Sequence, residues 1–344
     1  MAVLVVAGCS KGDDQSTITP DEPQAICFGS AAKTVSADGR AATLIEQTDQ
    51  SDFRAQPFAV YGDWIYDVAT GRRQEVFHNQ LVSYGQGSSP SGWNYDPLQT
   101  WQYSGEYDFR AYWPASTAVM GTATAQNLAL EYNMLSNNED MMVAYAHCEA
   151  GNGGQPVELR FHHTLAAVAV KFRTLNAGLT SRVTNYYFTS LNHIGALPYN
   201  TTDPTIDLTD LWIYADGARS YVDPANIALS ERVREWSDAA GRVLTTSADD
   251  YPEEFDLFLP QSLVVGAGTP PPSITFTVEI DWNTTDTVTT TLELPTTDSN
   301  GDEMVWRAGK KYIYVVTIEA DRFDITVKSC EWDPIDAVTG DVNF

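Results

Sequence analysis

The stretch SITFTVEIDW, residues 273–282, decides the fold class, because its side chains alternate strictly between apolar and polar. One face of the extended chain carries Ile274, Phe276, Val278, Ile280 and Trp282, and the other carries Thr275, Thr277, Glu279 and Asp281. A period of two indicates a β-strand with one buried face. After the polar residues 283–286, VTTTLEL (288–294) repeats the alternation, so the two segments predict a β-hairpin.

The same alternation recurs along the chain. KKYIYVVTIEA (310–320) and FDITVKSCEW (323–332) predict a second hairpin. VELRFHHTLAAVAVKF (157–172) predicts one long strand whose apolar positions change from odd to even near His162 and His163. A change of phase inside a strand indicates a bulge or a passage between two buried faces. The best candidate for a helix is PANIALSERVREW, residues 224–236.

Many short strands, separated by turn residues and with few short helices, indicate an all-β protein built from two β-sandwich domains in tandem. The 344 residues are enough for two domains of ordinary size. Residues 10–24 are polar and acidic with two prolines, which is typical of a flexible tether. We therefore expect a tether up to residue 24, an N-terminal sandwich over 25–177 and a C-terminal sandwich over 178–344.

Charge and composition exclude several classes of function. The chain has 20 basic and 46 acidic residues, a net charge of -26, which repels phosphate backbones, so we expect no nucleic-acid partner. No apolar run reaches the length of a membrane-spanning helix. Cys9, Cys27, Cys148 and Cys330 lie far apart without a zinc-binding spacing, so no metal or cofactor is predicted, and a disulfide from Cys27 to Cys330 stays open.

Catalytic signatures are missing from the sequence. It contains no GxSxG, HExxH, SxxK or phosphate-binding loop in a suitable setting, and we predict no enzyme, with a hydrolase among the many carboxylates as the weakest alternative. His147-Cys148-Glu149 has the chemistry of a transition-metal site but is expected to end a strand. His162 and His163 point to opposite faces of a strand and are expected to pack there.

Residues 91–114, SGWNYDPLQTWQYSGEYDFRAYWP, hold eight aromatic side chains. Two interpretations stay open. The aromatics fill the first sandwich and support a long loop, or Trp93, Tyr95, Trp101 and Tyr103 form an exposed platform on which sugar rings stack.

The N-terminus carries a more specific signal. Val6-Ala7-Gly8-Cys9 matches the lipobox of bacterial lipoproteins, in which the Cys thiol accepts a diacylglycerol. Several acyl chains on Cys9 would anchor the protein durably to a membrane. The apolar region before Cys9 is short and lacks a positive segment, so we expect the chain to begin downstream of the native start. Residues 10–14, SKGDD, resemble the signal by which Bacteroides-type bacteria export lipoproteins to their outer surface.

Five blocks of the sequence resemble the fimbrillin (Mfa-like) family of Bacteroidales. They occur in the order of that family: YDFRAYWPAS (107–116), DMMVAYAHC (140–148), VELRFHHTLAAVAVKF (157–172), DLFLPQSL (256–263) and WRAGKKYIYVVTIEADRFDITVKSCEWDPI (306–335). The resemblance runs from about residue 25 to the end of the chain. It implies two transthyretin-like sandwich domains and a role in type V pili as a stalk, tip or anchor subunit.

The resemblance also implies an assembly mechanism. An arginine-specific protease removes the first strand of a family member, and a strand from another subunit then fills the groove. Here the first strand would include Ile26 and Phe28, and the cut would follow Arg40, with Arg54 as the second choice. In the tail VTGDVNF, the residues Val338, Gly340, Val342 and Phe344 share a face, which makes Val338, Val342 and Phe344 donor candidates. The tail is short for spanning a groove, which favours a tip or accessory subunit.

The sequence thus predicts a fimbrial structural or adhesive subunit at the outer membrane and cell surface. Its expected partners are other fimbrial subunits, bound by strand exchange, the outer-membrane lipid that Cys9 reaches before processing, and a host or bacterial surface ligand. The alternative function is a carbohydrate-binding surface lipoprotein that uses residues 91–114.

Overall fold

The computed structural model describes most of the chain, namely residues 24–29, 51–85, 92–150, 155–176, 178, 180–203, 206–215, 232–281, 285–298, 301–319, 322–332 and 335–337. The only helices within these ranges are α1 (Ser51–Ala55) and the 3-10 turns η2 (Leu208–Leu211) and η4 (Ala248–Asp250). Strands form the other regular elements, so the predicted all-β class is confirmed. Among the described residues, no helix has the length and hydropathy that a membrane crossing requires.

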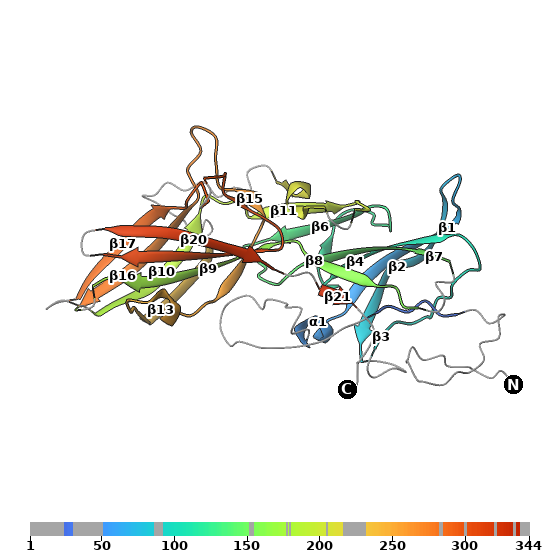
Figure 1. Ribbon diagram of the computed structural model, residues 1–344, viewed down its shortest axis with the longest axis horizontal. Coiled ribbons are helices and arrows are strands. Elements are labelled where there is room, and N and C mark those ends of the chain that lie inside the picture. The colour runs from blue at the N-terminus through green and yellow to red at the C-terminus, as the bar shows by residue number, and fades with distance from the viewer. Residues whose placement is uncertain are drawn as a thin grey trace.

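The N-terminal half is built on one seven-stranded sheet, which lies on the right of Figure 1. Its strands lie in the order β21-β8-β7-β4-β1-β2-β3, and every neighbouring pair is antiparallel. Their bounds are β1 Phe58–Asp67, β2 Arg72–Tyr84, β3 Trp93–Asn94, β4 Glu106–Trp113, β7 Met142–Glu149, β8 Leu159–His163 and β21 Ile335–Ala337. The last strand of the described residues, β21, therefore forms one edge of this N-terminal sheet.

The C-terminal half contains two four-stranded sheets that pack face to face. One has the order β13-β10-β16-β17 and the other β14-β9-β19-β20. Phe276 of β16 lies between the sheets, with its ring centroid 5.3 Å from that of Phe172 on β9 and 5.5 Å from that of Phe323 on β20. The bounds are β9 Ala166–Thr174, β10 Thr180–Thr189, β13 Val233–Val243, β14 Phe255–Phe258, β16 Ser273–Asp281, β17 Thr285–Glu293, β19 Lys310–Ile318 and β20 Phe323–Glu331.

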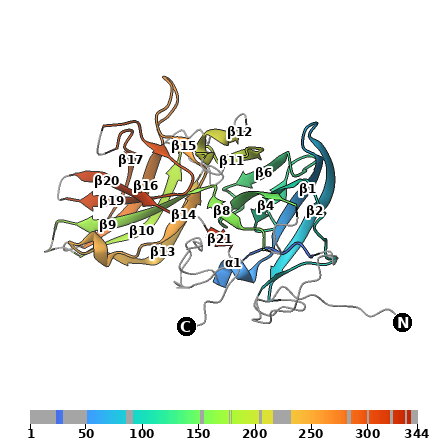
Figure 2. The same cartoon turned by 45° about the vertical axis from the view of Figure 1, so that its right-hand side comes forward.

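A third four-stranded sheet, β12-β11-β6-β5, joins strands from both halves of the sequence, and Figure 2 shows it above the junction of the two lobes. Its bounds are β5 Ala118–Val119, β6 Leu128–Asn133, β11 Ile194–Tyr199 and β12 Ile213–Tyr214. A two-stranded sheet of β15 (Gln261–Ser262) and β18 (Val305–Trp306) completes the fold.

The chain passes from one lobe to the other between β8 and β9. Only Thr164 and Leu165 separate these strands, yet β8 belongs to the N-terminal sheet and β9 pairs with β14 and β19. The prediction of one long strand over 157–172 is therefore wrong, because the segment forms two strands in different sheets. The predicted passage between two buried faces lies at Thr164 and Leu165, next to His162 and His163. All nine residues of β9 (Ala166–Thr174) lie before the expected boundary at 177, yet they belong to a C-terminal sheet. The division at 177 and 178 into transthyretin-like domains stays a prediction.

Two apolar clusters form the interior. The larger fills the C-terminal sandwich and extends under the β6–β11 sheet to Tyr61, Tyr112 and Val143 of the N-terminal sheet. The smaller covers the opposite face of that sheet and includes Phe58, Phe109 and Phe161. Residues of segment 24–29 and of helix α1, rather than a second sheet, close this smaller cluster. A core closed by such short pieces is easier to open than a core between two sheets.

Both predicted hairpins are confirmed. In the first, β16 pairs with β17, and Val278 lies opposite Val288; in the second, β19 pairs with β20 over nine residue pairs. The predicted helix over 224–236 is wrong where it can be compared, because Val233 to Trp236 lie in β13. Trp236 pairs with Tyr186 of β10, and the stacked rings lie 5.5 Å apart, so tertiary packing overrides the weak helical pattern. Residues 224–231 lie outside the described ranges.

Candidate functional site

The segment 24–29 lies in the N-terminal lobe as an extended piece of chain that pairs at its two ends. At one end, the Ile26 amide donates to the Gln99 carbonyl (2.9 Å), and the Trp101 amide donates to the Gln24 carbonyl (2.9 Å). The hydroxyl of Tyr95 also donates to the Ile26 carbonyl at 2.7 Å. This end of the segment is therefore held by the loop between β3 and β4.

The other end of the segment pairs with the residue that leads into β8. The Val157 amide donates to the Cys27 carbonyl (2.7 Å), and the Gly29 amide donates to the Val157 carbonyl (3.0 Å). Phe28 thereby forms a parallel bridge with Val157. The residues of the predicted first strand thus form a short extended segment with isolated bridges, rather than a strand of the N-terminal sheet.

Phe28 is the central apolar contact of this segment. Its ring is 1% exposed and packs against four other rings. The centroid distances are 5.9 Å to Phe58, 5.6 Å to Phe77, 5.8 Å to Tyr95 and 5.8 Å to Phe109. Burying a side chain of this size stabilises the folded state by roughly 1.5–3 kcal/mol. We call the residues that receive the segment, namely Phe58, Phe77, Tyr95, Gln99, Trp101, Phe109 and Val157, the seat.

Ile26 contributes a second buried side chain, with no exposed area. Together, Ile26 and Phe28 stabilise the segment mainly by apolar burial, because four backbone hydrogen bonds add only about 1 kcal/mol each. Loss of the segment would expose aromatic rings and leave the backbone groups of Val157, Gln99 and Trp101 without these partners. An apolar trough beside unpaired backbone groups is the surface that selects an incoming strand.

The C-terminal strand β21 lies beside the seat, because it pairs with β8, and β8 begins just after the seat residue Val157. Ile335 pairs with Phe161, Asp336 with Arg160 and Ala337 with Leu159, all in antiparallel register. Figure 1 shows this short red strand next to β8, among the green and blue elements of the N-terminal lobe. The sequence did not predict this pairing, since periodicity inside a segment does not reveal its partner.

Trp332 fixes the point from which β21 leaves the C-terminal lobe. Its amide donates to the Gly309 carbonyl at 2.8 Å, and its side chain is 3% exposed. Its ring stacks on that of His163 at a centroid distance of 3.7 Å. His163 in turn lies with Nδ1 2.8 Å from a carboxylate oxygen of Asp140, and both side chains are fully buried. Only residues 333 and 334 separate this anchor from β21.

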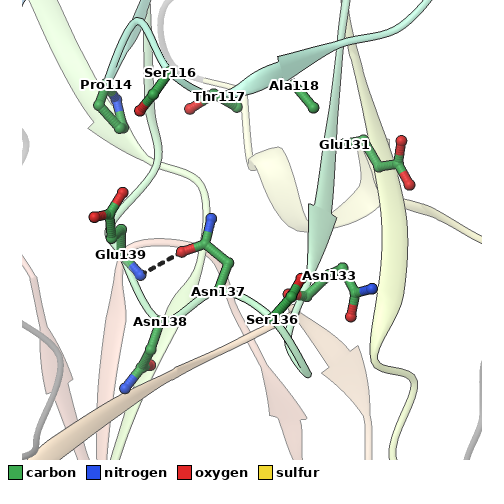
Figure 3. A pocket seen from close by; sticks show the side chains of 10 residues that line it. All are labelled: Pro114, Ser116, Thr117, Ala118, Glu131, Asn133, Ser136, Asn137, Asn138 and Glu139. Carbon is green, nitrogen blue, oxygen red and sulfur yellow. Dashed lines mark hydrogen bonds between the residues drawn. The ribbon is translucent and has the colours of Figure 1, made fainter.

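A separate cavity of about 620 Å³ opens beside β6 and is lined almost entirely by polar side chains. Figure 3 shows Glu139 on one side, Glu131 on the other and the amide group of Asn137 between them. The Oδ1 atom of Asn137 accepts from the Glu139 amide at 2.7 Å, which turns its Nδ2 donor toward the cavity. The hydroxyl of buried Tyr132 donates to the Glu139 carbonyl at 3.0 Å and holds this loop in place.

The side chains that line the cavity place hydrogen-bond donors and acceptors close to one another. Asn133 is oriented in the same way as Asn137, because its Oδ1 accepts from the Leu135 amide at 2.9 Å. Ser116 and Thr117 add hydroxyl groups to the lining. Fixed amides and carboxylates suit a ligand rich in hydroxyl groups, each of which both donates and accepts a hydrogen bond.

The aromatic residues of 91–114 mostly fill the core. Trp93 and Trp101 are 2% and 4% exposed, and Trp101 packs edge-on against Tyr107 at 4.8 Å. Tyr95 lies against Phe28, and burial raises the pKa of its hydroxyl. Of the four platform candidates, Tyr103 alone is exposed. Their placement agrees with the interpretation that they support the first lobe, and it leaves Trp93 and Trp101 no open face for a sugar.

His147, Cys148 and Glu149 end β7, as expected. His147 Nδ1 lies 2.8 Å from Oδ1 of Asp108, which also accepts from the Tyr145 hydroxyl at 2.8 Å, while Oδ2 of Asp108 accepts from Arg73. Burial alone would raise the pKa of Asp108, but these hydrogen bonds hold it below its usual value. Within the described ranges, no cluster of three or more His, Cys, Asp or Glu side chains is arranged to hold a metal ion.

Among the residues that the structure describes, the carboxylates with a shifted pKa do not form a pair in a cleft. Burial raises the pKa of Asp256 to about 6, but its side chain accepts from Asn138 at 2.8 Å and lies beside Arg234. It is therefore part of a structural network on β14, and it does not line the cavity beside β6. Cys148 and Cys330 are free, so the open alternative of a Cys27–Cys330 disulfide is not formed.

Several predicted site residues fall outside the described ranges, namely Cys9, Arg40, Val338, Val342 and Phe344. Arg54, the second choice for cleavage, is described and lies in helix α1, with its guanidinium 4.4 Å from the centre of the Tyr84 ring. A protease binds its substrate in an extended conformation, so cleavage after Arg54 requires this helix to unfold.

Comparison with known proteins gives one family and a set of similar structures. A family model described as fimbrillin-like matches residues 47–331. A fimbrial protein from Bacteroides vulgatus has a TM-score of 0.59 at 13% identity, covering 90% of this chain and 99% of that one. A putative cell adhesion protein from Bacteroides uniformis gives 0.49 at 15% identity, covering 90% and 99%.

The tip fimbrial protein Mfa3 from Porphyromonas gingivalis gives a TM-score of 0.39 at 10% identity, covering 90% of this chain and 100% of that one. No curated protein matches the chain in a sequence comparison. At 13% identity, the structure of the Bacteroides vulgatus protein shows a shared fold, which covers 90% of this chain and extends over both lobes.

Proposed function

Since this chain belongs to the fimbrillin-like family, we propose that it is a cell-surface fimbrial subunit that is assembled by strand exchange after its first segment is removed. The observation that carries this proposal is the way segment 24–29 is held. Ile26 and Phe28 are completely or almost completely buried, yet the segment makes only two isolated bridges. Its place can therefore be taken by another strand with apolar residues at matching positions.

The proposed sequence of events begins at a membrane. Acyl chains on Cys9 anchor the precursor to the outer membrane, and the polar residues 10–24 act as the tether. Cleavage after Arg40 separates residues 1–40 from the folded protein, so the lipid anchor and segment 24–29 leave together. The seat then becomes available only at the cell surface, which delays polymerisation until export is complete.

Arginine-specific proteolysis of the purified full chain tests this proposal. We expect a new N-terminus at Ala41 and multimers that resist SDS. An Arg40→Lys variant should stay uncut and monomeric, whereas the matched Arg54→Lys variant should behave like the original chain. A chain that resists the protease and never multimerises would contradict the proposal.

A second candidate function rests on the polar cavity beside β6. We propose that it binds a hydroxyl-rich surface ligand such as a glycan, because the amide donors of Asn133 and Asn137 are fixed by backbone hydrogen bonds. This would serve the adhesive role with residues other than the predicted aromatic platform. Glycan-array screening of the intact protein is the direct measurement.

The control for this candidate is a charge-matched pair of variants. Glu131→Gln changes an acceptor in the cavity, and Glu293→Gln changes an exposed carboxylate on β17, outside the cavity. Weaker glycan binding by the first variant alone would support the assignment. Equal binding by both variants would contradict it.

A further inference from the structure

Strand β17 forms a long edge of the C-terminal sandwich. It is the last strand of the sheet β13-β10-β16-β17, and in the part of the chain that the structure describes no strand pairs with its other side. All nine of its residues pair with β16 without a bulge, and Figure 1 shows it beside that strand. A regular edge of this length presents a row of unpaired backbone N–H and C=O groups, which can pair with a strand of another molecule.

The other sheet edges among the described residues carry features that oppose such pairing. β13, at the far edge of the same sheet, pairs with β10 through two shifts of register, and Arg234 within it has a φ of 54°. β20, at the edge of the facing sheet, carries the exposed Lys328. The remaining edge strands, β3, β5, β12, β14, β15, β18 and β21, have two to four residues each. Bulges, lysines and short strands keep edges from pairing, whereas residues 285–293 contain no Lys, Arg, Pro or Gly.

Apolar side chains are half-buried at the same side of the sandwich. Val288 and Leu292 of β17 pack on the C-terminal core but stay partly exposed. Phe323 and Ile325 of β20, which contacts β17, are half-buried in the same way. A strand placed along β17 would cover apolar area as well as backbone groups, so its binding would not depend on hydrogen bonds alone.

The outer face of β17 is a row of exposed threonines. Two of them already pair with threonines of β16 across the sheet. The Oγ1 atoms of Thr289 and Thr277 lie 3.0 Å apart, and those of Thr291 and Thr275 lie 2.8 Å apart. Such cross-strand threonine pairs stabilise a sheet, and a further strand with threonines at matching positions would extend the row.

The sequence of β17 matches a second copy of itself in this way. In an antiparallel pair centred on Thr289, that residue lies opposite Thr289 of the second copy, and Thr287 lies opposite Thr291. Asp286 and Glu293 then lie opposite uncharged residues rather than opposite each other. Residues directly opposite each other lie on the same side of the sheet, so the apolar faces of both copies stay on one side.

We propose that β17 pairs antiparallel with β17 of a second copy about Thr289, so that two four-stranded sheets join into one of eight strands. This contact belongs to the C-terminal lobe and uses neither segment 24–29 nor its seat, so it goes beyond the proposed strand exchange. It joins subunits side by side, whether or not the first segment has been removed. Because the net charge of -26 on each copy opposes it, the contact is reversible and depends on concentration and salt.

Sedimentation equilibrium of the uncut full chain at physiological ionic strength measures this association over a range of concentrations. Thr289→Lys places two like charges opposite each other at the centre of the pair, and Thr289→Glu does the same with the other sign. We expect each variant alone to raise the dissociation constant of the dimer at least about tenfold. An equal mixture of the two variants should restore the association, because opposite charges then meet at the centre.

The matched control is Thr122→Lys, since Thr122 is exposed in the turn between β5 and β6, outside the C-terminal sandwich. It should associate like the original chain, and equal thermal midpoints would show that all the variants fold. An original chain that stays monomeric at every concentration would overturn the inference. A mixture that associates no more strongly than its components would overturn it as well.

Hydrogen exchange provides a test that needs no substitution. We expect the backbone amides of β17 to exchange more slowly in a concentrated sample of the original chain than in a dilute one. Equal exchange in the two samples would contradict pairing at this edge. The dimer dissociates in SDS, whereas the multimers expected from strand exchange do not, so failure of either proposal can be recognised without the other.

Discussion

Phe28 is the single residue on which the stability of the first segment depends most. Its ring touches Phe58, Phe77, Tyr95 and Phe109, so Phe28→Ala removes the centre of an aromatic cluster and leaves a cavity. We expect the free energy of unfolding to fall by about 3–5 kcal/mol in urea denaturation of the uncut chain. The matched control is Tyr103→Ala, because Tyr103 is 78% exposed. Equal losses in the two variants would contradict the central role of Phe28.

Asp256 gives the protein a pH dependence that can be predicted in sign. Burial raises its folded-state pKa to about 6, above the ordinary value of 3.8. The folded state therefore keeps its proton in a range where the unfolded state has lost it, and stability falls as pH rises from about 4 to about 6. The size of the decrease is roughly 3 kcal/mol.

Chemical denaturation of Asp256→Asn across this pH range checks the assignment. The variant keeps an oxygen acceptor for Asn138 but cannot ionise. We expect the unfolding free energy of the variant to stay constant between pH 4 and 6, whereas that of the original chain decreases over this range. An unchanged pH profile would mean that another group titrates there.

At the scale of elements, the backbone of strand β1 lies close to two aromatic rings of the seat. Its pairing with β2 shifts register on both sides of Gly62. A Cβ atom at Gly62 would lie 2.8 Å from a ring carbon of Phe77 and 2.9 Å from one of Phe109. Both rings contact Phe28, so crowding at Gly62 would be transmitted to the first segment.

We expect Gly62→Ala to lower the unfolding free energy by about 1–3 kcal/mol, because an extra methyl group in a packed core forces rings out of place. Gly266→Ala is the control, since a Cβ there meets no atom within 4 Å. Thermal denaturation followed by near-ultraviolet circular dichroism would report both the loss and the disturbed aromatic cluster. A thermal midpoint of Gly62→Ala equal to that of Gly266→Ala would show that the strand absorbs the methyl group.

At the scale of the whole molecule, the net charge of -26 opposes the approach of two copies. Salt weakens this repulsion, because the Debye length falls from about 30 Å at 0.01 M to about 8 Å at 0.15 M ionic strength. We expect multimer formation by the cleaved chain to accelerate about tenfold over this range. Light scattering measures the rate, and mass spectrometry of fragment 1–40 confirms equal cleavage. A rate that falls with salt would mean that attraction between charges drives assembly.

The sequence by itself determined the strands, because alternation is local. Val278 and Val288 lie opposite each other in the hairpin that it predicts, and the change of phase near His163 marks the passage between the lobes. The resemblance to the fimbrillin family placed Ile26 and Phe28 in the first strand, and the structure shows that both side chains are buried. The helix that the sequence predicted over 224–236 is wrong at Val233–Trp236, where pairing with β10 outweighs local preference.

Only the tertiary structure decided which strand lies beside which. β21 pairs with β8 across 174 positions of sequence, from Ile335 to Phe161, and no periodic pattern inside either segment specifies that partner or its register. The same holds for Trp93 and Trp101, whose burial depends on what covers them rather than on their own neighbours in sequence. A side chain's alternation is fixed by the geometry of its own backbone, whereas its partner is fixed by contacts that form only when distant segments meet.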